Sequence, residues 1–116
     1  MKIAYQGIAG SYSESCAKEK YPNCETISCK TFDDCFEKAN EDSSVKAIIP
    51  ESNKTTGNIG VEYLIFKYRL NIYAEHFFPI NHNLLGVPGS KISDIKDVYS
   101  HAQALSQSTK FMKKNN

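Results

Sequence analysis

The sequence carries almost no net charge and contains no long apolar run. Lys and Arg number 14 and Asp and Glu 13, so the formal net charge at pH 7 is +1. A basic excess, which would point to nucleic acid or to an anionic membrane surface, is therefore missing. The longest apolar runs are short, such as Ala47-Ile48-Ile49, which argues against a transmembrane helix. We expect neither a nucleic-acid partner nor a membrane partner.

Signals for secretion and for structural metal are also missing. Met1 to Tyr5 lead directly into a strand-like stretch, without the apolar core and small-residue cleavage site of a signal peptide. The cysteines, at positions 16, 24, 29 and 35, contain no Cys-x-x-Cys pair, and the histidines have no metal-like spacing. Cys35 falls on the predicted helical stripe Phe32, Cys35, Phe36, Ala39. These features favour reduced, structural cysteines and a cytoplasmic protein.

The residues that are present suit one ordinary globular domain. The 116 residues are enough to bury a core without a metal or a disulfide. Hydrophobic residues at 41% and charged residues at 23% argue against a disordered tail, a collagen-like fibre and a coiled coil. No internal repeat or flexible linker is visible.

Strand-like and helical patterns alternate along the first two thirds of the chain. Strands are predicted over residues 2–6, 25–29, 45–50 and 70–78. Helices are predicted from Ser11 to Tyr21, from Thr31 to about residue 41, and on the stripe Val61, Leu64, Ile65 and Tyr68. Ser11 and Glu14 have capping-box spacing. Strands separated by helices imply crossover connections and a mostly parallel sheet, so the predicted fold class is α/β.

The pattern beyond Phe78 is less regular. Short strands are predicted over residues 83–87 and 98–100, with a helical turn from Ile92 to Lys96 between them. Ser100, with Gln103 at the capping-box position, is predicted to begin a helix that continues to about Lys114. Because no strand follows this last helix, the α/β pattern looks unfinished.

Three loops at predicted carboxyl ends of strands or starts of helices carry polar groups that suit a ligand. The first, residues 6–13, has glycines at positions 7 and 10 but lacks the third glycine of a dinucleotide fingerprint. The second, residues 50–57, combines an amide, a cation and hydroxyls, and the third, residues 99–107, contains a predicted helix start. The structural alternatives are a plain tight turn for the first loop, a solvated loop for the second and an ordinary helix cap for the third.

Taken in order, these segments resemble prephenate dehydratase. The strongest match is the run Val98 to Gln107, which is similar to the family's Tyr-Ser-His-Pro-Gln-Ala-Leu-x-Gln run. Further matches are Ile3 to Gly7 with Gly10 to Ser13, Thr31 to Asp34, Ala47 to Pro50, and His82 to Gly86. The resemblance covers essentially all 116 residues.

The resemblance implies a fold of two α/β lobes, like the type II periplasmic binding proteins, with the site in the cleft between them. Residues 1–74 would form most of the first lobe. Residues 75–116 would form the hinge, near Glu75, and the beginning of a second lobe within which the chain is truncated. A homo-oligomer or a partner chain would then complete the fold.

The resemblance also implies an enzyme, a carbon–oxygen lyase of phenylalanine biosynthesis. Prephenate would lose carbon dioxide and water to give phenylpyruvate, without a metal or a cofactor. The substrate-binding residues carried over from the family are Asn53, Thr55, Ser100, Gln107, Ser11 and Ser13.

Two departures separate the sequence from the family pattern. The family's polar loop reads Pro-Ile-Glu-Asn-Ser or Thr, whereas spacing from Pro50 to Gly57 puts Glu51, Ser52 and Lys54 at the Ile, Glu and Ser/Thr positions. A one-residue slip would restore Glu51 and displace Asn53. The family's Thr-Arg-Phe segment, which supplies the catalytic threonine, has no counterpart in these residues. The catalytic residue is therefore unassigned, and this short chain is expected to be inactive or dependent on a partner.

Two alternatives stay open. The chain is also compatible with a binding module that holds a carboxylate ligand without reaction, because a fold does not determine a function. Arogenate dehydratase is the other alternative, since nothing in the sequence shows whether the substrate side chain carries a keto or an amino group.

Overall fold

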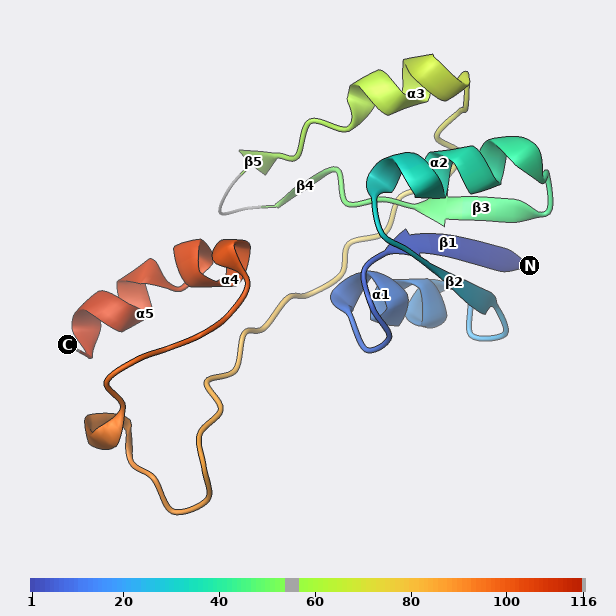
Figure 1. Ribbon diagram of the computed structural model, residues 1–116. Coiled ribbons are helices and arrows are strands. Elements are labelled where there is room, and N and C mark those ends of the chain that lie inside the picture. Colours follow the sequence, from blue (N-terminus) through green and yellow to red (C-terminus); the bar gives the residue numbers. More distant parts are fainter. Residues whose placement is uncertain (54–56, 116) are drawn as a thin grey trace. The chain divides into compact units, whose positions relative to one another are not determined.

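A computed structural model describes residues 1–53 and 57–115 (Figure 1). Contacts between residues are concentrated within two units, Met1–Pro79 and Ile80–Asn116. Unit 1 contains a parallel sheet and the three helices α1, α2 and α3. Unit 2 contains the short helices α4 and α5 and a single 3₁₀ turn. Among the described residues, no helix combines the length and the hydropathy that a membrane crossing needs.

Three parallel strands form the sheet of unit 1, and their order is β2-β1-β3. They are β1 (Lys2–Gln6), β2 (Glu25–Cys29) and β3 (Val45–Ile48). Ala4 of β1 lies opposite Ile27 of β2 on one side and Ala47 of β3 on the other. The predicted parallel sheet and its first two strands are confirmed. The third strand ends two residues earlier than predicted, before Pro50, which has no N–H group to donate to a neighbouring strand.

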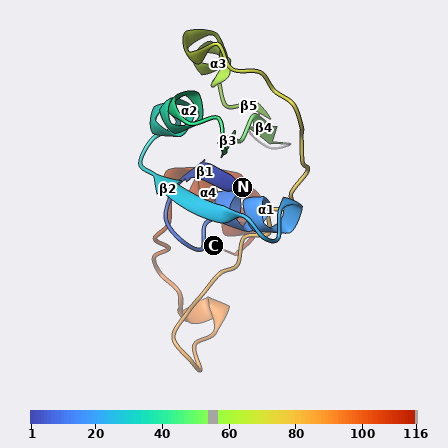
Figure 2. The same cartoon turned by 90° about the vertical axis from the view of Figure 1, so that its right-hand side faces the viewer.

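Two helices cover opposite faces of this sheet (Figures 1 and 2). Helix α1 (Tyr12–Lys20) connects β1 to β2, and α2 (Phe32–Glu41) connects β2 to β3. These two crossovers run in opposite directions across the sheet, and because each crossover is right-handed the helices fall on opposite sides. The central strand is consequently buried on both faces, and Ile3, Ala4 and Tyr5 are each at most 1% exposed.

The predicted cap residues of both helices, Ser11 and Thr31, are confirmed, but the capping box predicted at α1 is not formed. At α2 the Thr31 hydroxyl accepts from the Asp34 N–H at 3.1 Å, and the Asp34 carboxylate accepts from the Thr31 N–H at 2.9 Å. This reciprocal pair is a complete capping box. At α1 the Ser11 hydroxyl accepts from the Glu14 N–H at 3.4 Å. The Glu14 carboxylate, however, accepts from Gly10 and not from Ser11.

Two apolar clusters in the core of unit 1 lie on either side of α2. Ala4, Cys29, Cys35 and Val45 pack between the sheet and α2. Phe36, Val61 and Leu64 pack between α2 and α3 (Glu62–Tyr68). Burial, followed by the neighbouring Cys29 thiol, raises the pKa of the Cys35 thiol, so it stays protonated. The prediction of a structural Cys35 on a buried helical stripe is confirmed, and all four cysteines are free.

Polar contacts at the helix surface complete the docking of α3 on α2. Asp33 of α2 accepts from the Lys67 ammonium at 2.7 Å and from the Tyr68 hydroxyl at 2.8 Å. The Tyr68 ring stacks on Phe36 with the ring centroids 6.0 Å apart. Helix α3 ends at Arg69, which adopts a left-handed conformation with φ of +52°.

The predicted strand over residues 70–78 is wrong. This segment has no regular secondary structure and joins no sheet, and side-chain contacts hold it against the C-terminal end of α1. Lys20 donates to the Glu75 carbonyl at 2.9 Å, the Tyr21 and Tyr73 hydroxyls are 3.1 Å apart, and His76 contacts Glu19 at 2.9 Å. A strand needs a neighbouring strand to satisfy its backbone N–H and C=O groups. The alternating apolar residues of this segment are therefore not sufficient to make it a strand.

Unit 2 differs from the sequence prediction in its two strands, in the cap of one helix and in the continuity of that helix. The predicted strands over 83–87 and 98–100 are not formed, although the helical turn is present as a 3₁₀ turn over Ile92–Asp94. The cap of α4 (Ala102–Gln107) is His101 rather than Ser100, because the His101 Nδ1 accepts from the Gln103 N–H at 3.2 Å. The helix predicted to reach Lys114 is interrupted at Ser108 and resumes as α5 (Thr109–Lys114).

Candidate functional site

The loop from Gly7 to Ser11 connects the carboxyl end of β1 to the start of α1, as predicted. Gly7 and Gly10 have φ angles of +125° and +85°, in the region that favours glycine. The Gly7 N–H donates to the Cys29 carbonyl at 3.0 Å, and the Ser28 hydroxyl donates to the Gly7 carbonyl at 2.5 Å. A Cβ atom at Gly7 would lie 3.3 Å from the Ser11 hydroxyl oxygen. The chain therefore passes too close to Ser11 to carry a larger residue comfortably.

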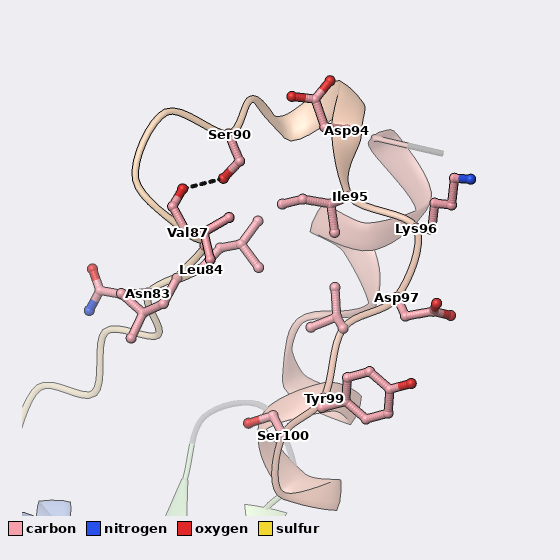
Figure 3. Close-up of a pocket in the computed structure, with 13 residues that line it drawn as sticks. Asn83, Leu84, Val87, Ser90, Asp94, Ile95, Lys96, Asp97, Tyr99 and Ser100 are labelled. Atoms are coloured by element: carbon pink, nitrogen blue, oxygen red, sulfur yellow. Dashed lines mark hydrogen bonds between the residues drawn. The ribbon is translucent and has the colours of Figure 1, made fainter.

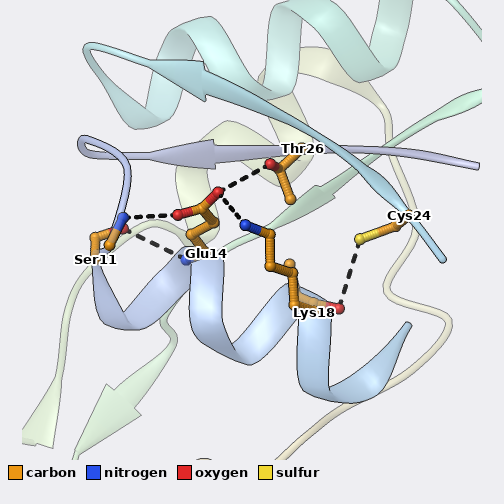
Figure 4. Close-up of polar contacts among 7 residues, drawn as sticks. Ser11, Glu14, Lys18, Cys24 and Thr26 are labelled. Atoms are coloured by element: carbon orange, nitrogen blue, oxygen red, sulfur yellow. Dashed lines mark hydrogen bonds and ion pairs between the residues drawn. The ribbon is translucent and has the colours of Figure 1, made fainter. Parts of the chain in front are cut away.

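A buried carboxylate lies beside this loop (Figure 4). Glu14 is 8% exposed, and one of its oxygens accepts from the Gly10 N–H at 2.7 Å. The other oxygen accepts from the Lys18 ammonium at 2.7 Å and from the Thr26 hydroxyl at 3.1 Å. Glu14 thus joins the loop, helix α1 and strand β2.

These contacts lower the pKa of Glu14 from its usual value of 4.5 to about 2. The hydrogen bond from Lys18 is the main cause, and the Gly10 N–H is the next. The same contact raises the pKa of Lys18. Because Glu14 stays ionised at neutral pH, it cannot serve as a proton donor to a leaving group. Its spacing from Ser11 indicated only a helix cap, and its contacts across the fold had no signal in the sequence.

Ser11 and Ser13 lie together at the start of α1, and both are half-buried. Ser11 is the cap residue of the helix, and its hydroxyl already accepts from the Glu14 N–H. A hydroxyl that accepts one hydrogen bond keeps its own hydrogen to donate. The start of α1 therefore offers a donor group from Ser11 next to the positive end of the helix dipole.

The second predicted loop contains a short antiparallel pairing that the sequence did not predict. Asn53 belongs to β4 (Ser52–Asn53), where it lies opposite Gly57 of β5 (Gly57–Asn58). The Ile59 N–H donates to the Glu51 carbonyl at 2.9 Å and extends this pairing. Thr55 and Lys54 lie outside the described residues.

Gln107 and Ser100 belong to unit 2. The Gln107 Oε1 lies 2.8 Å from the His82 Nε2. No local sequence pattern predicts this contact between His82 and Gln107. Ser100 lines an open cavity of about 680 Å³ between residues 83–87 and 94–100 (Figure 3). Leu84 and Ile95 point into this space.

The apolar side chains around that cavity are poorly covered. Leu85, Val87 and Tyr99 are 87%, 77% and 89% exposed within this chain. No group of three His, Cys, Asp or Glu side chains suited to a metal ion occurs among residues 1–53 and 57–115.

The sequence was compared with protein-family models and with known proteins. The family model described as prephenate dehydratase matches residues 3–116. The chain belongs to the prephenate dehydratase family. Arogenate dehydratase/prephenate dehydratase 1 of Arabidopsis thaliana is 45% identical over 108 residues, which are 92% of this chain and 28% of that protein. Arogenate dehydratase 2 of Petunia hybrida is 44% identical over 108 residues, which are 92% of this chain and 27% of that protein.

A solved structure has a similar fold. A protein titled GqqA, a novel type of quorum quenching acylases, aligns with a TM-score of 0.73 and 28% identity. The alignment covers 99% of this prephenate dehydratase family member and 42% of that chain. The chain thus spans about a quarter of the length of the two plant relatives.

Proposed function

We propose that this chain takes part in the conversion of prephenate to phenylpyruvate in phenylalanine biosynthesis, with loss of carbon dioxide and water. The observation that carries the proposal is the prephenate dehydratase family match over residues 3–116. The names of the two plant relatives, an arogenate/prephenate dehydratase and an arogenate dehydratase, support the reaction class.

The reaction needs positioned donors more than it needs a strong base. The ring carboxylate leaves as carbon dioxide, and its electron pair makes the ring aromatic as the ring hydroxyl departs. A proton joins that hydroxyl to give water. Aromatisation supplies much of the driving force, so holding the dianionic substrate in the reactive geometry is a large part of the task.

We assign the holding of the substrate to the six residues carried over from the family resemblance. Ser11 and Ser13 would donate to a carboxylate at the start of α1, where the helix dipole also favours an anion. The Gln107 amide would donate through its nitrogen, since its oxygen already lies at hydrogen-bond distance from His82. Asn53, Thr55 and Ser100 complete the proposed binding set on the strength of the family resemblance. No metal or cofactor is part of the proposal.

The architecture we propose is the two-lobed one of the type II periplasmic binding proteins. Residues 1–74 would form most of the first lobe, and residues 75–116 would form the hinge and the beginning of the second. Binding of a ligand between two lobes closes them, so the radius of gyration measured by X-ray scattering should fall when prephenate is added to the active assembly. A radius that prephenate leaves unchanged would contradict a closing cleft.

We expect the 116 residues alone to turn prephenate over poorly. No Thr-Arg-Phe run occurs among them, so the proposed proton donor would come from a second chain or a further segment. The exposed apolar residues of unit 2 also favour association with such a partner or with a second copy. Monomeric, concentration-independent cooperative melting would argue against this dependence.

The substrate side chain is keto in prephenate and amino in arogenate. The names of both plant relatives include arogenate, which makes arogenate dehydratase the second candidate. A competition assay with equal concentrations of the two substrates, read by chromatography of phenylpyruvate and phenylalanine, would decide between them.

The four free thiols support a reducing compartment, and we propose the cytoplasm, which fractionation of the source cells would test.

The first experiment measures phenylpyruvate formation from prephenate at neutral pH, with a control lacking protein because acid converts prephenate spontaneously. Asn53→Ala and Gln107→Ala should abolish any turnover. Gln103→Ala is the matched control for Gln107, because Gln103 lies one turn earlier on α4 and is exposed. Calorimetric binding of prephenate without any product would instead favour the binding module.

A further inference from the structure

Glu14 is a buried acid that the proposed reaction does not use. It is 8% exposed, and as a carboxylate it is ionised at neutral pH. Buried carboxylates are rare unless their oxygens are paired, because the loss of hydration must be offset by hydrogen bonds or by an opposite charge. The hydrogen-bond partners of Glu14 should therefore indicate which segment of the fold it stabilises.

Those contacts divide between the two carboxylate oxygens. Oε1 faces the scaffold, where it accepts from Lys18 of α1 and from Thr26 of β2. Oε2 faces the loop and accepts from the Gly10 N–H at 2.7 Å. The Glu14 N–H donates to the Ser11 hydroxyl, so Glu14 contacts both Gly10 of the loop and Ser11, the cap residue of α1 (Figure 4).

The loop needs such an anchor because its own sequence leaves it conformationally free. Gly7 and Gly10 both adopt positive φ angles, and glycine has more backbone conformations available than any other residue. Nothing lies within 4 Å of the position that a Cβ of Gly10 would take, so side-chain packing does not restrain that residue. The charged hydrogen bond to Glu14 Oε2 restrains it instead.

The charge of Glu14 would repel an anionic ligand at the start of α1 if it were not compensated. Lys18 lies 2.7 Å from Oε1 and supplies the compensating charge one helical turn away. The pair can therefore restrain the loop without leaving a net negative charge beside the proposed carboxylate site.

We propose that Glu14 is a positioning residue for substrate binding: it holds the loop from Gly7 to Ser11 so that the Ser11 and Ser13 donors face a substrate carboxylate. The inference rests on the proposed function, because it assumes that a carboxylate binds at the start of α1. Glu14 touches no substrate and acts only through Gly10 and Ser11.

The anchoring step is tested first, in the unmodified protein and without a ligand. An N–H that donates to a carboxylate shifts its proton resonance when that carboxylate is protonated. The Gly10 amide proton should therefore titrate together with the Glu14 carboxyl near pH 2, and Gly10 should exchange slowly with solvent at neutral pH. A Gly10 resonance that does not follow the Glu14 titration would overturn the anchoring.

The binding step is tested with two variants that remove contacts on opposite oxygens. Glu14→Gln removes the charge that holds Gly10, and we expect prephenate and phenylpyruvate to bind about tenfold more weakly, the size expected for one lost charge-assisted hydrogen bond. Thr26→Val is the matched control, because it removes a hydrogen bond to Oε1 and leaves the loop side intact. It should change binding less than about twofold even where it lowers the melting temperature.

The outcomes separate the two proposals. Equal loss of affinity in Glu14→Gln and Thr26→Val would reduce Glu14 to a structural role and overturn the inference. If the unmodified protein binds neither prephenate nor arogenate while the Gly10 titration is observed, the proposed function fails together with the binding step. Should Glu14→Gln fail to fold, Glu14→Asp, whose shorter side chain withdraws from Gly10, gives the same comparison.

Discussion

Replacing Leu64 by alanine should weaken unit 1 substantially, because Leu64 joins α3 to α2. Leu64 is 1% exposed and packs with Phe36 and Val61. Alanine would remove most of the side chain and leave a cavity between the two helices. The hairpin that carries Asn53 immediately precedes α3 in the chain, so loss of this docking should also loosen the proposed binding segment.

The expected magnitude follows from burial. Fully buried Leu→Ala substitutions cost about 2 to 5 kcal/mol, and we expect about 3 kcal/mol here because partly buried neighbours such as Ile59 and Ile65 can relax into the space. A unit the size of Met1–Pro79 is typically stable by roughly 4 to 12 kcal/mol. The substitution should therefore remove a large share of that stability and lower the Tm by roughly 15 °C.

The assay is urea unfolding followed by far-UV circular dichroism, in reducing buffer at neutral pH. Tyr63→Ala is the matched control on the same helix, because Tyr63 is 65% exposed and its loss should cost less than about 0.5 kcal/mol. Amide exchange would show whether α3 opens separately from the sheet. A cost for Leu64→Ala as small as that for Tyr63→Ala would refute the packing of α3 on α2.

Four further predictions follow. The pKa of Glu14 is lowered in the folded state, so its contribution to the free energy of unfolding is present above pH 4.5 and is lost as the pH falls toward 2. The free energies of unfolding of the unmodified protein and of Glu14→Gln should therefore converge between pH 4.5 and pH 2. A difference that stays constant over this interval would contradict the lowered pKa. Thr31→Ala removes the cap of α2 and should cost about 1 kcal/mol in urea unfolding, whereas Thr31→Ser should restore most of it. Gly10→Ala should cost about 1 kcal/mol through its positive φ alone, since a Cβ there meets no atom, and unchanged unfolding would argue against that backbone conformation. His82→Phe should weaken prephenate binding through Gln107 in calorimetry while leaving the unfolding of unit 1 unchanged, and an intact affinity would remove His82 from the site.

The elements of unit 1 that are predictable from the sequence have local causes. The alternation of short strands with capped helices predicts the parallel sheet, and Thr31 is predictable as the residue that begins α2. The buried position of Cys35 followed from its helical stripe. The family was recognisable from motifs distributed along the chain, and the comparisons confirm it.

The missed features depend on contacts between distant residues. The spacing of Ser11 and Glu14 predicts a reciprocal bond, but the Ser11 N–H already donates to the Ile8 carbonyl at 3.1 Å, so Glu14 accepts from Gly10 instead. Both Ser100 and His101 offer an acceptor at the start of α4, and the imidazole is the one that reaches the Gln103 N–H. The contact of His82 with Gln107 links residues 25 apart in the sequence, which no local pattern encodes.

The strand predictions failed for a related reason. Residues 70–78, 83–87 and 98–100 contain alternating or continuous apolar side chains, which is the local part of a strand signal. The remaining part is a hydrogen-bonded neighbour, and within the described residues these segments have none that forms a ladder. A local pattern therefore shows that a segment can form a strand, whereas strand formation also requires a neighbouring strand from elsewhere.

The rate at which the core cysteines react with a thiol reagent should report the opening of unit 1. Cys29 and Cys35 are 5% and 0% exposed, between the sheet and α2, while Cys16 and Cys24 are only half-buried. A thiol reagent should therefore modify two cysteines quickly and two slowly, and the slow phase should follow the rate at which α2 separates from the sheet. The rate of this slow phase can be compared among the variants above without an added label, because Cys29 and Cys35 already lie in the core.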